Sequence, residues 1–563
     1  MKVATWRSVS GIASCKPQQR YARKARPVHV TRWRAHPVTW AVCSLATLAV
    51  VLHFAPAQAR SPPDVLVVVQ NLDDIQSLDP AEGFELSSVQ AFTSLYQRLV
   101  QSDPADAGAL RPSLASRWER GPDQRSLVFE LRAGARFASG NPVRPEDVIF
   151  SLARAVKLNR APVFILNELG WRAENVDRQF NKLDERHLEV RWSADVGVPL
   201  ALSILSAPVA SIIDAKQAEA HISHSDAGNA WLREHSGGSG PFQIRKYIAH
   251  EALVLDANPI CPGGVPRLRT VILRNVADAA VRRLLLEVGD ADVARDLGPD
   301  QLAALARKDH LKILRFPSAS VHYLLFNAAN GVDPVLANPA LWQAARWLID
   351  YQELATKLLK GTYEVHQAFL ADGFPGALEV TPFHLDVSKA RQILEQGGLG
   401  QGTHFELDIF NQPPFGEIAQ SLQASFARAG IRIDIRPQLA SEVYARIRAR
   451  SEEAAWLYWI PDYFDANSTA SAFALNREDG VATLAWRAGW HIPALSAQTE
   501  AARAEPDPAK RREMYREIQA EVQRDSPLVI ALQERSLLAM RDNVQGYRQG
   551  VNADMVYYDQ VTK

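Results

Sequence analysis

Two carboxylates, Asp462 and Asp465, lie in a short segment that is rich in aromatic residues. The aromatic members are Tyr458, Trp459, Tyr463 and Phe464. A carboxylate held away from water needs a charge-assisted partner such as an ammonium group, and aromatic rings can cover a ligand without selecting its identity. The alternative is that both acids belong to a turn, because Asp and Pro favour turns, and that the rings fill a core. This segment is the first candidate for a ligand site.

A second group of residues could bind a metal ion. His221, His224 and Asp226 are close in sequence, and His235 follows. Imidazoles three residues apart on a helix share a face and can act together as ligands. The Ser, Gly and Asn residues between them, however, are typical of a polar loop. We expect solvated histidines here rather than a metal site.

The chain lacks the sequence motifs of several enzyme classes. The turn Gly238-Ser239-Gly240 does not satisfy the G-x-S-x-G pattern of a nucleophile elbow. The sequence also contains no P-loop, zinc-protease or paired-cysteine motif. An exported hydrolase is therefore the less favoured alternative, and we expect neither an enzyme nor a cofactor.

Composition predicts a large globular protein. The chain has 563 residues, of which 47% are hydrophobic and 22% are charged, so it can bury a core in more than one domain. Residues 1–59 hold nine Lys or Arg and no acid. Without them the chain carries 54 basic and 63 acidic residues, a net charge of −9. Such a charge disfavours nucleic acid as a partner.

The N-terminal segment is typical of a secretory signal peptide. Its basic part is followed by an apolar run from Trp40 to Phe54 and by Ala57-Gln58-Ala59, a small-residue cleavage site. We therefore expect residues 1–59 to be removed and the protein to reach the periplasm. An uncleaved membrane anchor is the alternative, although the apolar run is short for a bilayer span. Cys261 alone remains in the mature chain, which excludes an internal disulfide.

Alternation and turn residues predict a strand, a turn and a helix between residues 112 and 152. Leu127, Phe129 and Leu131 alternate with more polar positions, as in a half-buried strand. Gly140-Asn141-Pro142 then supplies a turn. Pro145, followed by two acids, is typical of the first turn of a helix.

Further along the chain, the pattern predicts a β-α-β unit. Residues 405–410 alternate as a strand, residues 415–429 have a helical apolar face, and Gly430 ends that helix before a second strand at residues 431–435. This order implies parallel strands. Other expected elements are strands at 65–69, 321–327 and 528–532 and helices at 339–348 and 508–524.

These motifs, in this order, resemble those of the family 5 extracytoplasmic solute-binding proteins of bacterial ABC importers, of the dipeptide- and oligopeptide-binding type. The matching segments are Leu78-Asp79-Pro80, Pro112–Leu152, Gly238–Phe242, Asn258-Pro259 and Trp459–Asp465. The resemblance implies an α/β, two-lobed periplasmic binding protein fold of type II, cluster C, with an extra domain inserted in lobe one. It covers nearly the whole mature chain.

The resemblance also implies a division into lobes. The expected parts are a signal peptide at 1–59, lobe I at 60–98, 186–320 and 531–563, an inserted domain at 99–185 and lobe II at 321–530. The ligand is expected in the cleft between the lobes, which closes by hinge motion.

The family's W-x-x-D-Y-x-[DE]-P motif assigns roles to individual residues. By resemblance, Asp462 pairs with the α-amino group of a bound peptide, and breaking such a buried pair typically costs about 3–5 kcal/mol. Ala466 replaces the motif's proline and Pro461 precedes the acid, so the loop departs from the pattern. Some relatives also present acids where Glu82 and Glu85 lie.

The function expected from this resemblance is that of a monomeric, non-enzymatic carrier. It captures di- or oligopeptides and delivers them to an inner-membrane ABC permease with its ATPase subunits. The alternative is the same fold with another cargo, such as a nickel chelate, haem, an opine-like compound or another small solute, because a fold does not fix its ligand.

Overall fold

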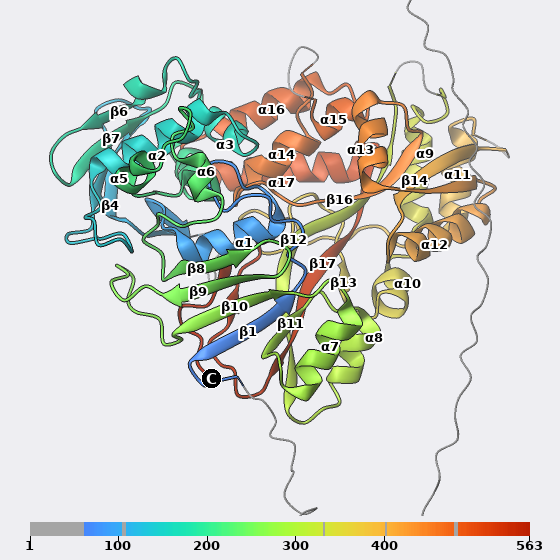
Figure 1. The fold of residues 1–563 in the computed structure, drawn as a ribbon. Coiled ribbons are helices and arrows are strands. Elements are labelled where there is room, and N and C mark those ends of the chain that lie inside the picture. The colour runs from blue at the N-terminus through green and yellow to red at the C-terminus, as the bar shows by residue number, and fades with distance from the viewer. Residues whose placement is uncertain (1–60, 104–108, 330–332, 400–401, 478–481) are drawn as a thin grey trace, which may run out of the picture. The chain divides into compact units, whose positions relative to one another are not determined.

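The computed structural model describes residues 61–563, apart from 104–108, 330–332, 400–401 and 478–481 (Figure 1). The expected signal peptide, residues 1–59, lies outside the described residues. None of the helices in the described part is both long enough and apolar enough to cross a membrane.

A mixed sheet of eleven strands organises the fold. In spatial order, the strands are β15 (Arg432–Gln438), β14 (His404–Phe410), β16 (Ala454–Trp459), β12 (Leu311–Phe326), β17 (Leu528–Arg541), β11 (Val293–Arg295), β1 (Val65–Gln70), β10 (Thr270–Asn275), β9 (Ala252–Ala257) and β8 (Phe242–Ile248). The short strand β13 (Tyr363–Val365) also pairs with β17. Sequence reasoning predicted strands at the positions of β1, β12, β14, β15 and the first part of β17, but not that they form one sheet.

Two long antiparallel strands, β12 and β17, connect the two halves of the sheet (Figure 1). Their pairing runs from Leu311 opposite Arg541 to Leu325 opposite Leu528, with an irregularity between Pro317 and Val321. At one end β17 pairs with β11, and at the other β12 pairs with β16. The predicted lobe boundaries at 320/321 and 530/531 fall inside these two strands, and they stay predictions.

Strand β1 is covered on both faces, as its continuous apolar sequence predicted. Leu66 and Val68 pack with helix α1 (Leu86–Leu95) in one core. Val67 and Val69 pack in a second core with helices α7 (Ala279–Val288) and α8 (Pro299–Leu305). Val556 and Val561, near the end of the chain, also belong to the first core. The C-terminal segment therefore returns to this half of the sheet.

A separate four-stranded antiparallel sheet has its own core. Its strands, in order, are β4 (Ala115–Arg120), β5 (Ser126–Leu131), β7 (His187–Arg191) and β6 (Phe180–Lys182). Helices α2 (Pro145–Leu158), α3 (Val163–Asn167) and α4 (Val198–Leu205) contribute to the same core. Short neighbours are β2 (Val100–Ser102), β3 (Leu110–Pro112), α5 (Ala215–Ala220), α6 (Asn229–Leu232) and the 3-10 turns Val176–Gln179 and Pro208–Ala210. The strand-turn-helix prediction for residues 112–152 is confirmed, with α2 beginning at Pro145.

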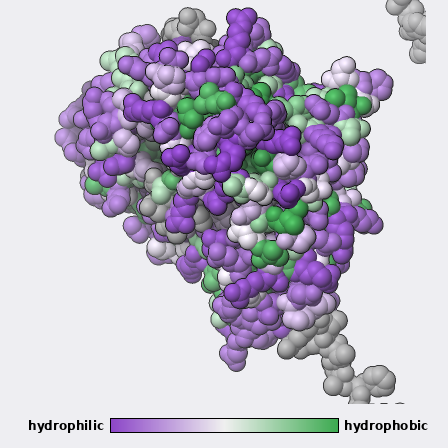
Figure 2. All heavy atoms as spheres, turned by 90° about the vertical axis from the view of Figure 1, so that its left-hand side faces the viewer, coloured by the Kyte–Doolittle hydropathy of each residue, from purple (hydrophilic) through white to green (hydrophobic). Residues whose placement is uncertain are grey.

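The β-α-β prediction in the second half is also confirmed. Strands β14 and β15 are parallel and are connected by helix α12 (Phe415–Ala427). The other helices are α9 (Pro339–Leu348), α10 (Tyr351–Glu353), a π-helical turn at Leu354–Leu358, α11 (Val387–Gln396), α13 (Ala440–Ala449), α14 (Ala466–Phe473), α15 (Leu484–Arg487), α16 (Pro493–Ala504) and α17 (Pro508–Asp525). A final pair, β18 (Arg548–Gln549) and β19 (Val556–Tyr557), follows β17. The face shown in Figure 2 is mostly hydrophilic, with hydrophobic residues in small patches.

Candidate functional site

A cavity of about 550 Å³ lies between the region of helix α3 and the segments that follow strand β16. This volume is in the range of small-molecule sites. Its lining residues are Phe164, Asn167, Glu168, Arg172, Trp459, Asp462, Tyr463, Ser468, Ser471, Ala472, Leu475, Arg477, Ala482, Thr483, Leu484, Arg487 and Arg503. Phe164 is 41% exposed although it is a large apolar residue, so the cavity offers an apolar wall as well as charges.

Asp462 is the acid that this cavity leaves without a partner. It lies three residues beyond the end of β16, and its backbone N–H donates to the Ser468 hydroxyl at 2.9 Å. Within the described part of the chain, its carboxylate makes no hydrogen bond and no ion pair. Burial raises the pKa of this carboxyl group to about 7, because the charged form loses solvation without gaining a partner. A cationic group in the cavity would supply that partner.

Trp459 and Tyr458 occupy the end of strand β16. The Trp459 ring packs edge-to-face against Phe473, with ring centroids 6.1 Å apart, and its buried indole N–H has no protein acceptor. Trp459 lines the large cavity and also an adjacent one of about 220 Å³, where Tyr458 joins it. Both residues thus reach cavity walls, while Tyr458 also packs against the buried ring of His322.

Tyr463 connects the second half of the chain to the core of the four-stranded sheet. Its ring is buried among residues of that core. Its hydroxyl donates to the Glu168 carboxylate, with oxygen distances of 3.0 and 3.1 Å. Asn467 donates to both Glu168 and the Tyr463 hydroxyl at 2.9 Å. Burial raises the pKa of Glu168 to about 7, so this acid and Asp462 form a pair of weakly solvated carboxyl groups beside one cavity.

Asp465 has a partner inside the protein. Its side chain caps helix α14 by accepting from the Asn467 N–H at 2.8 Å. The same carboxylate forms a bidentate ion pair with Arg511, at 2.6 and 2.9 Å, and both side chains are buried. The structure therefore places the two acids of the aromatic segment in opposite environments.

Glu82 and Glu85 do not line this cavity. Glu82 accepts from Arg233 at 2.6 and 2.7 Å and from Asn229 at 3.0 Å. The Arg233 guanidinium, the largest influence, lowers the pKa of Glu82 to about 2. Glu85 precedes helix α1, where it accepts from the Phe84 N–H at 3.2 Å. Their roles in ligand binding stay predictions.

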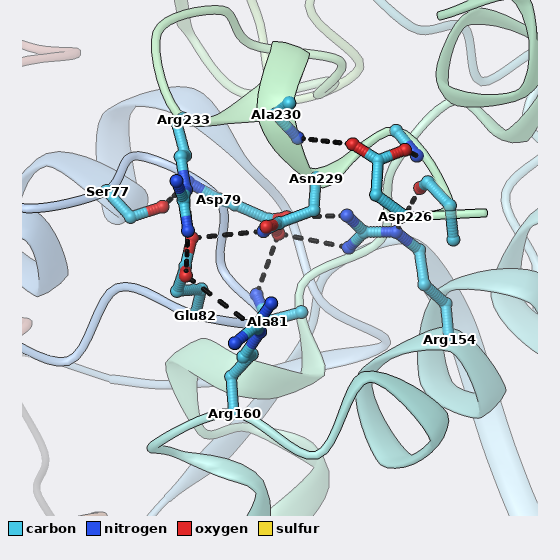
Figure 3. Close-up of polar contacts among 12 residues, drawn as sticks. Ser77, Asp79, Ala81, Glu82, Arg154, Arg160, Asp226, Asn229, Ala230 and Arg233 are labelled. Atoms are coloured by element: carbon cyan, nitrogen blue, oxygen red, sulfur yellow. Dashed lines mark hydrogen bonds and ion pairs between the residues drawn. The ribbon is translucent and has the colours of Figure 1, made fainter. Parts of the chain in front are cut away.

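Figure 3 shows that Glu82 belongs to a network around Asp79, the acid of the Leu-Asp-Pro turn. Arg154 of helix α2 forms a bidentate pair with Asp79, at 2.5 and 3.0 Å, and both side chains are buried. Asn229 donates to Asp79 at 2.7 Å, and the Arg154 Nε donates to the Ala227 carbonyl at 2.7 Å. These contacts fix the turn against α2 and the loop before α6.

The histidines and the acid of the possible metal site make structural contacts within the protein. The rings of His221 and His235 both stack on the Trp231 ring, at centroid distances of 4.4 and 4.9 Å. Asp226 accepts backbone N–H groups of Ser223 and Ala230, at 2.8 and 2.9 Å. Among the residues that the structure describes, no three His, Cys, Asp or Glu side chains could together hold a metal ion.

Sequence reasoning missed several charged residues of the cavity, among them Glu168, Arg487 and Arg503. Arg503 donates to the Glu168 carbonyl at 2.9 Å, although 335 residues separate them. Arg487 ends the four-residue helix α15. No local pattern marks any of the three, because only tertiary packing brings them beside Asp462.

Comparisons with known proteins agree with this architecture. The family model of bacterial extracellular solute-binding proteins, family 5 (middle), matches residues 109–480. The probable D,D-dipeptide-binding periplasmic protein DdpA of Escherichia coli K12 is 28% identical over 510 residues, which cover 90% of this chain and 95% of that protein.

Solved structures show the same fold. One is the periplasmic binding protein DppA from Helicobacter pylori in complex with peptide STSA, with a TM-score of 0.71, 20% identity and coverage of 88% of this chain and 98% of that one. Another is NikA from Staphylococcus aureus in complex with Ni(L-His)2, with a TM-score of 0.67, 19% identity and coverage of 89% and 100%. The fold is thus the mixed α/β fold of the cluster C periplasmic binding proteins.

The family model spans more than half of the chain, and the matching relatives are solute-binding proteins rather than enzymes. The chain therefore belongs to the bacterial extracellular solute-binding proteins of family 5, which serve ABC transporters.

Proposed function

We propose that this protein captures di- or oligopeptides in the periplasm and delivers them to an ABC permease with its ATPase subunits. The observation that carries the proposal is the unpaired carboxylate of Asp462 in a cavity of about 550 Å³. An isolated carboxylate in a poorly solvated place is costly, and an ammonium group offsets that cost through a charge-assisted hydrogen bond. The free α-amino group of a peptide is such a group.

The walls of the cavity suit a carrier with broad side-chain tolerance. Trp459 and the exposed ring of Phe164 offer apolar surface, which covers a ligand without requiring one side chain. The serines Ser468 and Ser471, which line the cavity, add hydroxyl groups that can form hydrogen bonds. A peptide backbone can use such groups whatever its sequence.

The relatives support a peptide cargo by their descriptions, since DdpA is described as a probable D,D-dipeptide-binding protein and the Helicobacter pylori DppA structure contains a peptide. The Staphylococcus aureus NikA structure, in contrast, contains a nickel complex of histidine. Peptides are favoured for this chain because its motif acid, Asp462, is free to bind an ammonium group. Export through the signal-like segment 1–59 would place the protein beside its permease.

The proposal can be tested by native mass spectrometry of the protein purified from cells, followed by calorimetric titration with di- to pentapeptides. We expect wild-type protein to bind peptides and Asp462→Asn to lose two or more decades of affinity, because breaking a buried ion pair typically costs about 3–5 kcal/mol. N-acetylation of the peptide should weaken binding to wild type by a similar factor and should change nothing in the variant.

A suitable control is Asp195→Asn, which removes a carboxylate that is 80% exposed and does not line the cavity. It should bind peptides as wild type does. Peptide binding that is indifferent to both Asp462→Asn and N-acetylation would overturn the assigned anchor. A protein that binds no peptide, but retains another small solute through purification, would transfer the proposal to the other cargoes of this family.

A further inference from the structure

Arg487 occupies a distinctive position between two cavities. It lines both the cavity of about 550 Å³ that contains Asp462 and the adjacent cavity of about 220 Å³. Trp459 and Leu484 are the other residues common to both linings. A ligand in the larger cavity would therefore have both Arg487 and Asp462 in its walls.

The guanidinium of Arg487 is not neutralised by the protein. In the described part of the chain it makes no ion pair, and its buried Nε has no acceptor. Burial is the largest cause that lowers the pKa of Arg487. Glu452 acts on it only through space, without an ion pair, and the nearby cation Arg448 has the opposite effect. The local charge is thus positive and incompletely solvated.

The other arginines of the larger cavity already have partners. Arg172 donates to the carbonyls of Asn167 and Trp171, at 2.8 and 2.7 Å. Arg477 forms an ion pair with Glu500, and Arg503 donates to the Glu168 carbonyl. The Arg487 side chain, unlike those of these three arginines, has neither a hydrogen-bond acceptor nor an ion-pair partner among the described residues, and in this it matches the Asp462 carboxylate in the same cavity.

The second cavity also provides neutral hydroxyl groups. Tyr323, Tyr444 and Tyr458 line it together with Arg487. Burial raises the pKa of each of these phenols, so they keep their protons. A guanidinium and phenolic O–H groups are all donors, and a carboxylate is the acceptor that matches a guanidinium in shape and charge.

We infer that Arg487 receives a carboxylate of the cargo, so that the site recognises a zwitterion by its ammonium end at Asp462 and its carboxylate end at Arg487. The ammonium end rests on the proposed function, whereas the carboxylate end rests on Arg487 itself. The carboxylate is either the free C-terminus of a short peptide or an acidic side chain. In both cases the protein discriminates against a neutral amide at that position.

Two matched pairs of peptides separate these sources. The first pair is Ala-Ala-Phe and its C-terminal amide, and the second is Ala-Glu-Phe-amide and Ala-Gln-Phe-amide. We expect wild type to prefer the carboxylate member of one pair at least tenfold, and Arg487→Gln to distinguish the two members less than twofold. The first pair reports recognition of a C-terminus and the second recognition of a side chain.

Arg432→Gln is the control, because it removes a guanidinium that is 70% exposed, is paired with Asp434 and lines neither of the two cavities. This variant should keep the wild-type preference for the carboxylate. If Arg487 has only a structural role, a different result is expected. Arg487→Gln would then weaken the binding of the carboxylate and amide peptides by the same factor and leave the ratio of their affinities unchanged.

A probe without an ammonium group tests Arg487 even if the protein binds no peptide. N-acetylglycine, at millimolar concentration, should raise the melting temperature of wild type more than N-acetylglycinamide does, and Arg487→Gln should remove this difference. The inference is wrong if wild type treats carboxylate and amide alike in all three comparisons. The proposed function fails independently, when Asp462→Asn and N-acetylation leave peptide affinity unchanged.

Discussion

Asp462 and Asp465 are three residues apart and have opposite electrostatic environments. Asp465 is neutralised by Arg511 and caps helix α14. Asp462 faces a cavity with no compensating charge, and burial raises its pKa to about 7. Asp465 therefore stabilises the fold, whereas Asp462 costs stability in the absence of cargo and is available for binding.

Asp462→Asn should stabilise the unliganded protein, and more so at pH 8 than at pH 5. The carboxyl pKa is about 7 in the folded state and 3.8 in the reference state, so the folded protein binds more protons between these values. Stability consequently falls as pH rises through this window. The Asn side chain cannot ionise, so the substitution removes the free-energy cost of the buried carboxylate, which is on the order of 2–4 kcal/mol at pH 8. Urea unfolding at the two pH values measures the difference.

Asp465→Asn is the matched comparison and should act in the opposite direction. It leaves the buried Arg511 guanidinium without its counter-ion, which typically costs about 3–5 kcal/mol. Equal effects of the two substitutions on unfolding would contradict the assignment of separate roles to these acids.

At the scale of elements, a buried ion pair fixes helix α2 to the turn that follows strand β1. Asp79 and Arg154 have side chains that are 0% and 2% exposed. Asn229 completes the contacts of Asp79 from helix α6 (Figure 3). The Leu-Asp-Pro motif therefore has a structural explanation, since its acid connects the turn after β1 of the large sheet to helix α2, which packs in the core of the small sheet.

Arg154→Met should reduce the free energy of unfolding by about 3–5 kcal/mol, because it leaves Asp79 buried without its cation. Lys157→Met on the same helix is the control. Its ion pair with Asp177 is exposed, at 47% and 65%, so its loss should change stability by less than about 1 kcal/mol. Denaturant titration of both variants tests the difference, and similar losses would refute the special role of the buried pair.

For the whole molecule, several buried acids share the behaviour of Asp462. Burial is the largest cause that raises the pKa of Glu168, Glu452 and Glu534 to about 7 and that of Asp147 to about 6. Each binds a proton in the folded state at a pH where the unfolded chain has lost it. Their ionisation consequently destabilises the fold as pH rises toward 8.

We expect the melting temperature of the unliganded protein to fall by several degrees between pH 6 and pH 8. The buried His322 has the opposite dependence, because burial lowers its pKa from 6.5 to about 3 and stability then rises with pH. That contribution is complete by about pH 7, so the acids determine the slope above it. Calorimetry at constant ionic strength measures the trend, and a melting temperature that rises toward pH 8 would contradict it.

The local elements could be predicted from the sequence because their signals are local. Apolar continuity predicted β1, Pro145 and the acids after it predicted the start of α2, and Gly430 marked the end of the β-α-β helix. The order of short motifs also predicted the family, which the family model confirms over residues 109–480. Each prediction of an element used residues within one helix, strand or turn.

The site required the tertiary structure because its charges are far apart in sequence. Asp462 could be singled out by its motif, but neither its unpaired state nor the pairing of Asp465 with Arg511 follows from residue order. Glu168 reaches Tyr463 across 295 positions, and Arg487 is an ordinary helix-end arginine until packing places it beside two cavities. Sequence determined the elements and the family, whereas only packing decided which charges are neutralised, because solvation and ion pairing depend on the neighbours in space.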